Sequence, residues 1–178
     1  MAKHKIWNTD SAAKEVANLW GGIKGEQLAM MKTYIQVTKY KKGEIIYENG
    51  TIPKEAMCLL AGKVKIYKDG INGKSQIIRV IKPSEFLGFR AYFANEAYRT
   101  AAMALDNCVV AHFPMKVLMK MLQSSYNIGF YFIKYLSIEI GKSDDRTVNL
   151  TQKHIRARLA EALLFLHDSY GLAKDGVK

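Results

Sequence analysis

Short alternating runs of residues, separated by glycines, fill the chain between positions 33 and 83. The runs are TYIQVTKY, GEIIYENG, EAMCLLAGKVKIYKDG and SQIIRVIKP, and glycines stand at 43, 50, 62, 70 and 73. Apolar and polar residues that alternate over four to eight positions are typical of strands with one buried face, and glycine marks the turns between them. Two more runs, TAAMAL and CVVAHFP, follow with an Asp106-Asn107 turn between them. The spacing predicts a compact antiparallel barrel or jelly roll.

Helical patterns flank this barrel on both sides. Asp10 or Ser11 can cap a helix over SAAKEVANLW, which Gly21-Gly22 ends, and EQLAMMK predicts a second short helix. In that second helix, Leu28, Met30 and Met31 are expected in the core. After Pro114, MKVLMKML predicts another short helix. The fold class is therefore α+β, with helices before and after a small barrel.

A long helix is expected from about Asn127 to about Leu150, and the apolar residues of its first half point in nearly every direction. Such a helix must be covered on all sides, and a small barrel can cover only one of them. The sequence therefore predicts a homodimer through this helix, with burial inside one subunit as the alternative. Gly141 interrupts the helix and costs about 1 kcal/mol relative to alanine. A last helix from about Thr151 would carry an apolar stripe before Gly171 stops it; the stripe consists of Ile155, Leu159, Ala162, Leu163 and Leu166.

The charge and composition of the chain limit the classes of partner that it can have. The chain has 178 residues, 49% of them apolar, and 27 Lys and Arg against 16 Asp and Glu give a net charge of +11. This favours anionic partners such as nucleic acid, nucleotides or an acidic membrane face, although the lysines are scattered rather than gathered in one run. No apolar stretch is long enough to span a bilayer and the start has no signal-peptide core, so a cytoplasmic protein without a membrane partner is expected. Cys58 and Cys108 lie too far apart for a metal knuckle, and both are interpreted as core residues.

The segment of residues 83–105, PSEFLGFRAYFANEAYRTAAMAL, is the candidate site, and we call it the cradle segment. Gly88 can open a helical turn whose free N–H groups attract an anion, and Arg99 can bind an anion with two parallel hydrogen bonds. Thr100 follows and begins a new apolar run. The alternative is structural: Arg99 pairs with Glu96 or Glu85, and Thr100 is an ordinary strand residue.

In this order of elements, the sequence resembles the effector-binding half of the Crp/Fnr family of bacterial transcription regulators. The resemblance covers roughly Tyr34 to Tyr170, and its more specific pieces are KKGEIIYENG, LLAGKVKIYKDG, PSEFLGF and the YRTAAMAL strand opening. It implies a cyclic-nucleotide-binding-like barrel with N-terminal helices in residues 1–125 and a dimerisation helix in residues 126–151. Residues 152–178 would be a linker helix and tail towards an absent DNA-binding domain.

The resemblance also implies a ligand site. Gly88, Arg99 and Thr100 match the residues that begin and end the phosphate-binding segment of cyclic-AMP-binding members. Phe89 stands where those members have an acid for the ribose hydroxyl, and an unpaired buried polar group costs about 1–3 kcal/mol. Ser143 and Asp144 on the long helix match positions that face the base. Cyclic AMP is therefore disfavoured, no cofactor is assigned, and a small anionic effector is the expected ligand.

The family resemblance implies a sensing and dimerising domain that moves attached DNA-binding domains when a ligand enters the barrel. No helix-turn-helix is expected in this chain, because the seven residues after Gly171 cannot form one. Haem would need an axial imidazole, and the cluster-binding cysteines of some members are missing. The chain is not expected to be an enzyme: a cupin-type metal site needs an HxH pattern that is absent. A dimerisation scaffold without a ligand stays open as the second hypothesis.

Overall fold

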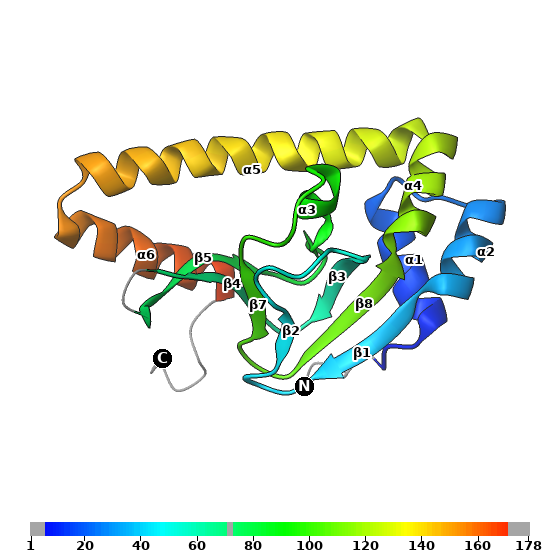
Figure 1. The fold of residues 1–178 in the computed structure, drawn as a ribbon, viewed down its shortest axis with the longest axis horizontal. Coiled ribbons are helices and arrows are strands. Elements are labelled where there is room, and N and C mark those ends of the chain that lie inside the picture. The colour runs from blue at the N-terminus through cyan, green and yellow to red at the C-terminus, as the bar shows by residue number, and fades with distance from the viewer. Residues whose placement is uncertain (1–5, 71–72, 171–178) are drawn as a thin grey trace. The chain divides into compact units, whose positions relative to one another are not determined.

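The computed structural model describes residues 6–70 and 73–170, and the chain divides into two compact units, Met1–Gly129 and Phe130–Lys178. The first unit holds two N-terminal helices, the strands, and helices α3 and α4 (Figure 1). The second holds most of α5 and all of α6. The predicted boundaries after residues 125 and 151 remain predictions.

Helix α1 (Thr9–Leu19) begins at a cap that the sequence analysis missed. Asn8 is the N-cap: its side chain accepts the Ser11 N–H at 2.8 Å, and the Ser11 hydroxyl accepts the Asn8 N–H at 2.9 Å. This reciprocal pair satisfies two backbone donors, so the prediction of Asp10 or Ser11 as the cap was wrong. Asp10 instead forms ion pairs with Lys14 and Lys32.

Helix α2 (Gly25–Tyr34) extends further than predicted. Thr33 and Tyr34, which the alternating pattern assigned to the first strand, end this helix, and the Thr33 hydroxyl donates to the Ala29 carbonyl at 3.0 Å. Of the three residues predicted for the core, Met31 is buried, whereas Leu28 and Met30 are half-buried. The first strand therefore begins at Gln36.

Two four-stranded antiparallel sheets form the barrel. One has the order β1-β8-β3-β6 and the other the order β2-β7-β4-β5. In the first sheet the strands are β1 (Gln36–Tyr40), β8 (Cys108–Pro114), β3 (Glu55–Ala61) and β6 (Phe86–Leu87). In the second they are β2 (Ile45–Tyr47), β7 (Ala101–Ala104), β4 (Val64–Asp69) and β5 (Ser75–Ile81). The predicted fold class, an α+β chain with a small antiparallel jelly-roll barrel, is confirmed.

The core lies between the two sheets and continues under the N-terminal helices. Leu59, Val64 and Val110 are fully buried between the sheets, with small residues beside them on β7. On the outer side of the first sheet, Trp20 stacks on Phe86 with ring centroids 5.6 Å apart. Cys58 and Cys108 are both free and buried, which confirms their interpretation as core residues. The thiols add no reactive site, because burial raises the pKa of both.

Helices α4 (Met115–Ser124), α5 (Tyr126–Gln152) and α6 (Ile155–Tyr170) follow the barrel in sequence. The bounds of α5 agree with the predicted long helix, whereas α6 begins four residues after the predicted Thr151. Ile155, Leu159 and Leu163 of the predicted stripe are exposed. The side chain of Leu166 and the predicted stop at Gly171 lie outside the part of the chain that is described. Within residues 6–70 and 73–170, no helix combines the length and the hydrophobicity that crossing a membrane requires.

The turn between β3 and β4 depends on Gly62. Its φ is +89°, and a Cβ there would lie 2.6 Å from the Asn107 carbonyl oxygen. Gly43 has a similar φ of +88°, but a Cβ there would have no atom within 4 Å. A substitution at Gly43 therefore measures the cost of the backbone conformation alone, without steric crowding. We expect Gly62→Ala to lower the free energy of unfolding by about 2–5 kcal/mol, and Gly43→Ala by about 1–2 kcal/mol. Urea denaturation measures both, and equal losses would show that crowding at Gly62 is unimportant.

Candidate functional site

The cradle segment turns sharply at Gly88, between β6 and the short helix α3 (Phe89–Phe93). Gly88 has φ +82°, and a Cβ there would lie 2.3 Å from Met57 Cε and 3.1 Å from the Tyr98 hydroxyl. Only glycine combines this backbone conformation with such close neighbours. The segment is thereby held against β3, which fixes where α3 begins.

Phe89, the first residue of α3, is buried and packs against Phe93 with ring centroids 5.8 Å apart. The position next to Gly88 therefore supplies an apolar side chain to the core and no carboxylate to the site. A sugar hydroxyl would find no acceptor on this side chain.

Arg99 lies at the surface and is bound by Glu96. Its Nη2 lies 2.6 Å from Glu96 Oε2, and Arg90 Nη1 lies 3.1 Å from Glu96 Oε1. We call this arrangement the Glu96 bridge. The Arg99 side chain is 71% exposed, Arg90 58% and Glu96 20%. Of the two acids considered as partners for Arg99, Glu96 is the one observed, because Glu85 accepts the Lys82 N–H in its own turn.

Two stacked tyrosines close the space behind Arg99. The rings of Tyr47 and Tyr98 have centroids 4.0 Å apart at an angle of 23°, and the Tyr47 hydroxyl lies 3.5 Å from Thr100 Oγ1. The cavity that remains, the cradle hollow, has about 40 Å³ and is lined by Gly88, Arg90 and Arg99 together with Thr100 and the tyrosines. Burial raises the pKa of both tyrosines, and both therefore stay neutral.

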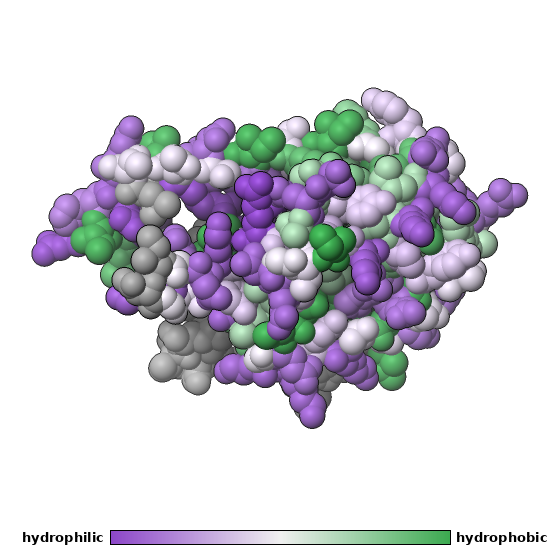
Figure 2. All heavy atoms as spheres, in the orientation of Figure 1, coloured by the Kyte–Doolittle hydropathy of each residue, from purple (hydrophilic) through white to green (hydrophobic). Residues whose placement is uncertain are grey.

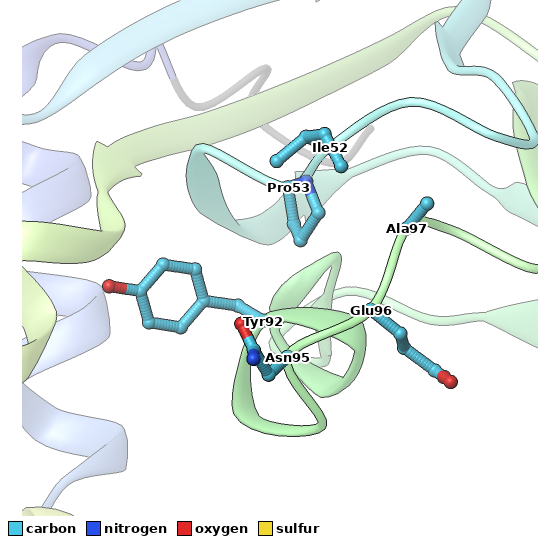
Figure 3. A pocket seen from close by; sticks show the side chains of 6 residues that line it. All are labelled: Ile52, Pro53, Tyr92, Asn95, Glu96 and Ala97. Atoms are coloured by element: carbon cyan, nitrogen blue, oxygen red, sulfur yellow. The ribbon is translucent and has the colours of Figure 1, made fainter.

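A larger cleft of about 350 Å³ lies on the other side of Glu96, and we call it the side cleft. Ile52 and Pro53 form one wall, and Tyr92 and Asn95 lie opposite, with Ala97 beside them (Figure 3). The Glu96 side chain points away from Ile52 and Pro53 in this view. Glu96 thus borders the side cleft while its carboxylate binds the two arginines.

Ser143 and Asp144, the other two predicted site residues, lie on α5 in the second unit, and both are exposed. The Ser143 carbonyl accepts the Thr147 hydroxyl at 3.0 Å. In the first unit the structure brings Gly88, Arg99 and Thr100 together around the cradle hollow. A role for Ser143 and Asp144 in the same site stays a prediction.

Sequence reasoning missed Arg90, Tyr47 and Tyr98. Arg90 lies in α3 and Glu96 lies beyond its end, so helical spacing does not pair them, and the turn after α3 brings them together. Tyr47 comes from β2, and only the fold places it on Tyr98. The sequence did contain a signal for Tyr98, which directly precedes Arg99. Neighbouring side chains of an extended segment point to opposite sides, so an aromatic ring next to an arginine at the surface is expected to point inward.

His112 of β8 is buried, and it lies in a hydrogen-bond chain with the half-buried Tyr40 and with Glu55, whose side chain is 45% exposed. Its Nδ1 lies 3.0 Å from Glu55 Oε2, and its Nε2 lies 3.2 Å from the Tyr40 hydroxyl. A carboxylate only accepts, so Nδ1 carries the proton and the tyrosine donates to Nε2. Both ring nitrogens are therefore engaged, which leaves none for a haem iron. Among the described residues, no three His, Cys, Asp or Glu side chains gather as metal ligands do.

Comparison with known proteins agrees with this geometry. Residues 37–125 match the Cyclic nucleotide-binding domain family. An uncharacterized protein of Haemophilus influenzae is 31% identical over 101 residues, which are 56% of this chain and 78% of that protein. The CRP-like cAMP-activated global transcriptional regulator of Mycobacterium tuberculosis is 18% identical over 160 residues, which are 90% of this chain and 71% of the regulator. The structure of FixK2 from Bradyrhizobium japonicum shares the fold, with a TM-score of 0.69 and 22% sequence identity. The match covers 78% of this chain and 68% of FixK2.

The fold and the matched half of the chain define a regulatory domain rather than an enzyme. The chain belongs to the cyclic nucleotide-binding domain family, and those of its relatives that carry a functional name are regulators of the Crp/Fnr type.

The buried His112 generates a pH prediction. Burial lowers the pKa of His112 below its usual value near 6.5, and the attraction of Glu55 opposes this only in part. The unfolded chain then binds more protons than the folded one as the pH falls through 6.5. The stability that the neutral His112 contributes is thus fully present above pH 6.5, and it is lost as the pH falls towards the pKa of His112 in the folded protein.

We expect the free energy of unfolding to fall between pH 7.5 and 5.5, and His112→Gln to flatten that fall. His154→Gln, a change at an exposed histidine directly before α6, is the matched control and should leave the slope unchanged. Denaturant titrations at several pH values measure the slopes. Identical slopes for the wild type and His112→Gln would contradict the assignment.

Proposed function

We propose that this chain is the effector-sensing and dimerising part of a Crp/Fnr-type transcription regulator. A small anionic effector binds the barrel at the cradle segment, two copies pair through α5, and ligand binding repositions the paired helices to control DNA-binding domains. The observation that carries this proposal is the apolar face that α5 presents to solvent.

That face has the spacing of a coiled-coil seam. Phe130, Ile133, Ile140 and Val148 are between 47% and 62% exposed, and hydrophobic side chains reach the surface along α5 (Figure 2). The polar residues Ser137 and Asp144 stand on the same face, so its positions follow at steps of three or four residues, although not all of them are apolar. Exposed apolar residues on one face of a helix bury themselves against a second helix of the same kind. A second copy of this chain supplies that helix.

The anionic character of the effector rests on Arg90, Arg99 and Thr100. Two guanidinium groups and a hydroxyl around the cradle hollow can bind phosphate or carboxylate oxygens with charge-assisted hydrogen bonds. The Mycobacterium tuberculosis relative is named as activated by cAMP. For this chain, Phe89 without a carboxylate and a hollow of about 40 Å³ argue for a smaller ligand than a nucleotide.

A second function, a dimerisation scaffold without a ligand, is favoured by one observation. The Glu96 bridge and the stacked tyrosines already satisfy the arginines and fill the interior. In that case the barrel would be a solid support for α5. Ligand screening separates the two functions.

Dimerisation is tested by removing the seam. We expect the double variant Ile133→Gln/Ile140→Gln to be monomeric where the wild type is a dimer, because it loses two apolar contacts per helix without adding charge. Lys134→Gln/Asp145→Gln changes two exposed α5 residues outside the seam and should remain dimeric. Sedimentation velocity at several protein concentrations measures this. A wild type that stays monomeric and folded at high concentration would contradict the proposal.

Effector binding is tested by thermal shift against nucleotides, 2-oxo acids and other small anions. A ligand at 100 times its Kd stabilises the fold by about 2.7 kcal/mol, which raises Tm by about 5–10 °C. Arg99→Ala should abolish the shift, and Lys116→Ala, at an exposed position of α4, should retain it. If no compound changes Tm, the ligand-free scaffold is the better description.

A further inference from the structure

Glu96 occupies the place of an anion at the rim of the cradle hollow. Each of its carboxylate oxygens faces a different arginine, at 3.1 Å for Arg90 and 2.6 Å for Arg99. The three residues come from α3 and from the turn that follows it, so this contact forms within one short segment. The arginines that would bind an effector are thus already bound by the chain itself.

We propose that Glu96 is a built-in competitor that restricts the site to compact oxyanions, of the size of inorganic phosphate or sulfate. The inference rests on the proposed function, because it assigns the ligand class of the same site. The oxyanion replaces the Glu96 carboxylate between Arg90 and Arg99 and accepts a hydrogen bond from Thr100.

The strength of the bridge permits this exchange. Both arginines are more than half exposed, whereas the Glu96 side chain is 20% exposed, so solvent screens the two ion pairs from the arginine side. Such a contact can hold the arginines in place when no ligand is present and still be displaced by a doubly charged anion. A buried ion pair in the same place would resist displacement.

The side cleft gives the displaced carboxylate a place to go. Glu96 lines this cleft of about 350 Å³ together with Asn95, whereas the ring of Tyr92 points away from Glu96 (Figure 3). The Asn95 amide can donate a hydrogen bond to a carboxylate that turns towards it. Glu96 therefore exchanges one polar environment for another without losing all its partners.

The charges around the hollow favour a dianion. Arg90 and Arg99 line the hollow, and the Glu96 carboxylate bridges them. With Glu96 in place, these three side chains carry one positive charge in excess. When Glu96 leaves, the positive excess increases, and a dianion compensates it better than a monoanion such as cyclic AMP.

The volume excludes larger ligands. The stacked rings of Tyr47 and Tyr98 fill the interior behind the rim, and the backbone of Tyr98 is fixed by hydrogen bonds with Gly50 and Thr51 at 2.7 and 2.9 Å. A nucleoside would have to separate these rings. A phosphate or sulfate ion reaches the arginines from the solvent side and leaves the rings in contact.

The experiment measures the affinity of the full chain for inorganic phosphate, sulfate and cyclic AMP by isothermal titration calorimetry at constant ionic strength. We expect phosphate and sulfate to bind the wild type, and Glu96→Gln to bind them about three- to tenfold more tightly because it cannot compete as an anion. Glu26→Gln removes the same charge from α2 and should leave the affinity unchanged. Cyclic AMP should bind neither the wild type nor Glu96→Gln.

Each result decides between the proposals. Equal affinities of wild type and Glu96→Gln for phosphate would overturn the competitor role of Glu96 while leaving anion sensing intact. Tighter binding of cyclic AMP than of phosphate would overturn the size restriction. If Glu96→Gln binds none of the three probes and nothing from the wider panel changes Tm, the sensing function itself fails. A crystal structure with phosphate should show the Glu96 carboxylate in the side cleft, and a bridge unchanged beside bound phosphate would contradict the exchange.

Discussion

The contact between the rings of Tyr47 and Tyr98 determines what the barrel can hold. Tyr47 packs against the core between the two sheets, and the ring of Tyr98 stacks on it with centroids 4.0 Å apart. Backbone hydrogen bonds of Tyr98 with Gly50 and Thr51 hold one ring, and the small residues Ala102 and Ala104 let the sheets approach each other. The space around the two rings is therefore close-packed, and the charged side chains of the site lie at the rim.

At that rim the energetics are those of exposed charges. Arg90 and Arg99 keep most of their hydration, so their contacts with Glu96 are individually weak and sensitive to salt. The buried His112 behaves in the opposite way, because its contacts with Glu55 and Tyr40 fix which ring nitrogen carries the proton. The barrel thus contains a buried histidine, His112, whose partners are fixed, and an arginine pair at the rim whose contacts with Glu96 can be replaced.

The sequence predicted the fold well where the information is local. Alternating residues and glycine turns indicated the strands, and an apolar run of helical period indicated α5. It failed where two local preferences compete: Asn8 caps α1 in place of Asp10 or Ser11, and Thr33 and Tyr34 stay helical. At the site, the sequence offered Arg99 with Glu96 because they are three residues apart, whereas Arg90 and Tyr47 reach the same place only through the turn after α3 and the pairing of β2 with β7. Contacts of this kind, between residues that a turn or strand pairing brings together, leave no periodic pattern in the sequence.

The close-packed interior also fixes the thermodynamics of recognition. A ligand that enters an open apolar chamber releases water from its walls, and the heat capacity of the system then falls strongly. The stacked rings of Tyr47 and Tyr98 leave no such chamber between them, so the proposed ion exchange at the rim would displace little ordered solvent from apolar walls. Under that proposal, the binding enthalpy would vary little with temperature, and the affinity would depend on the salt concentration.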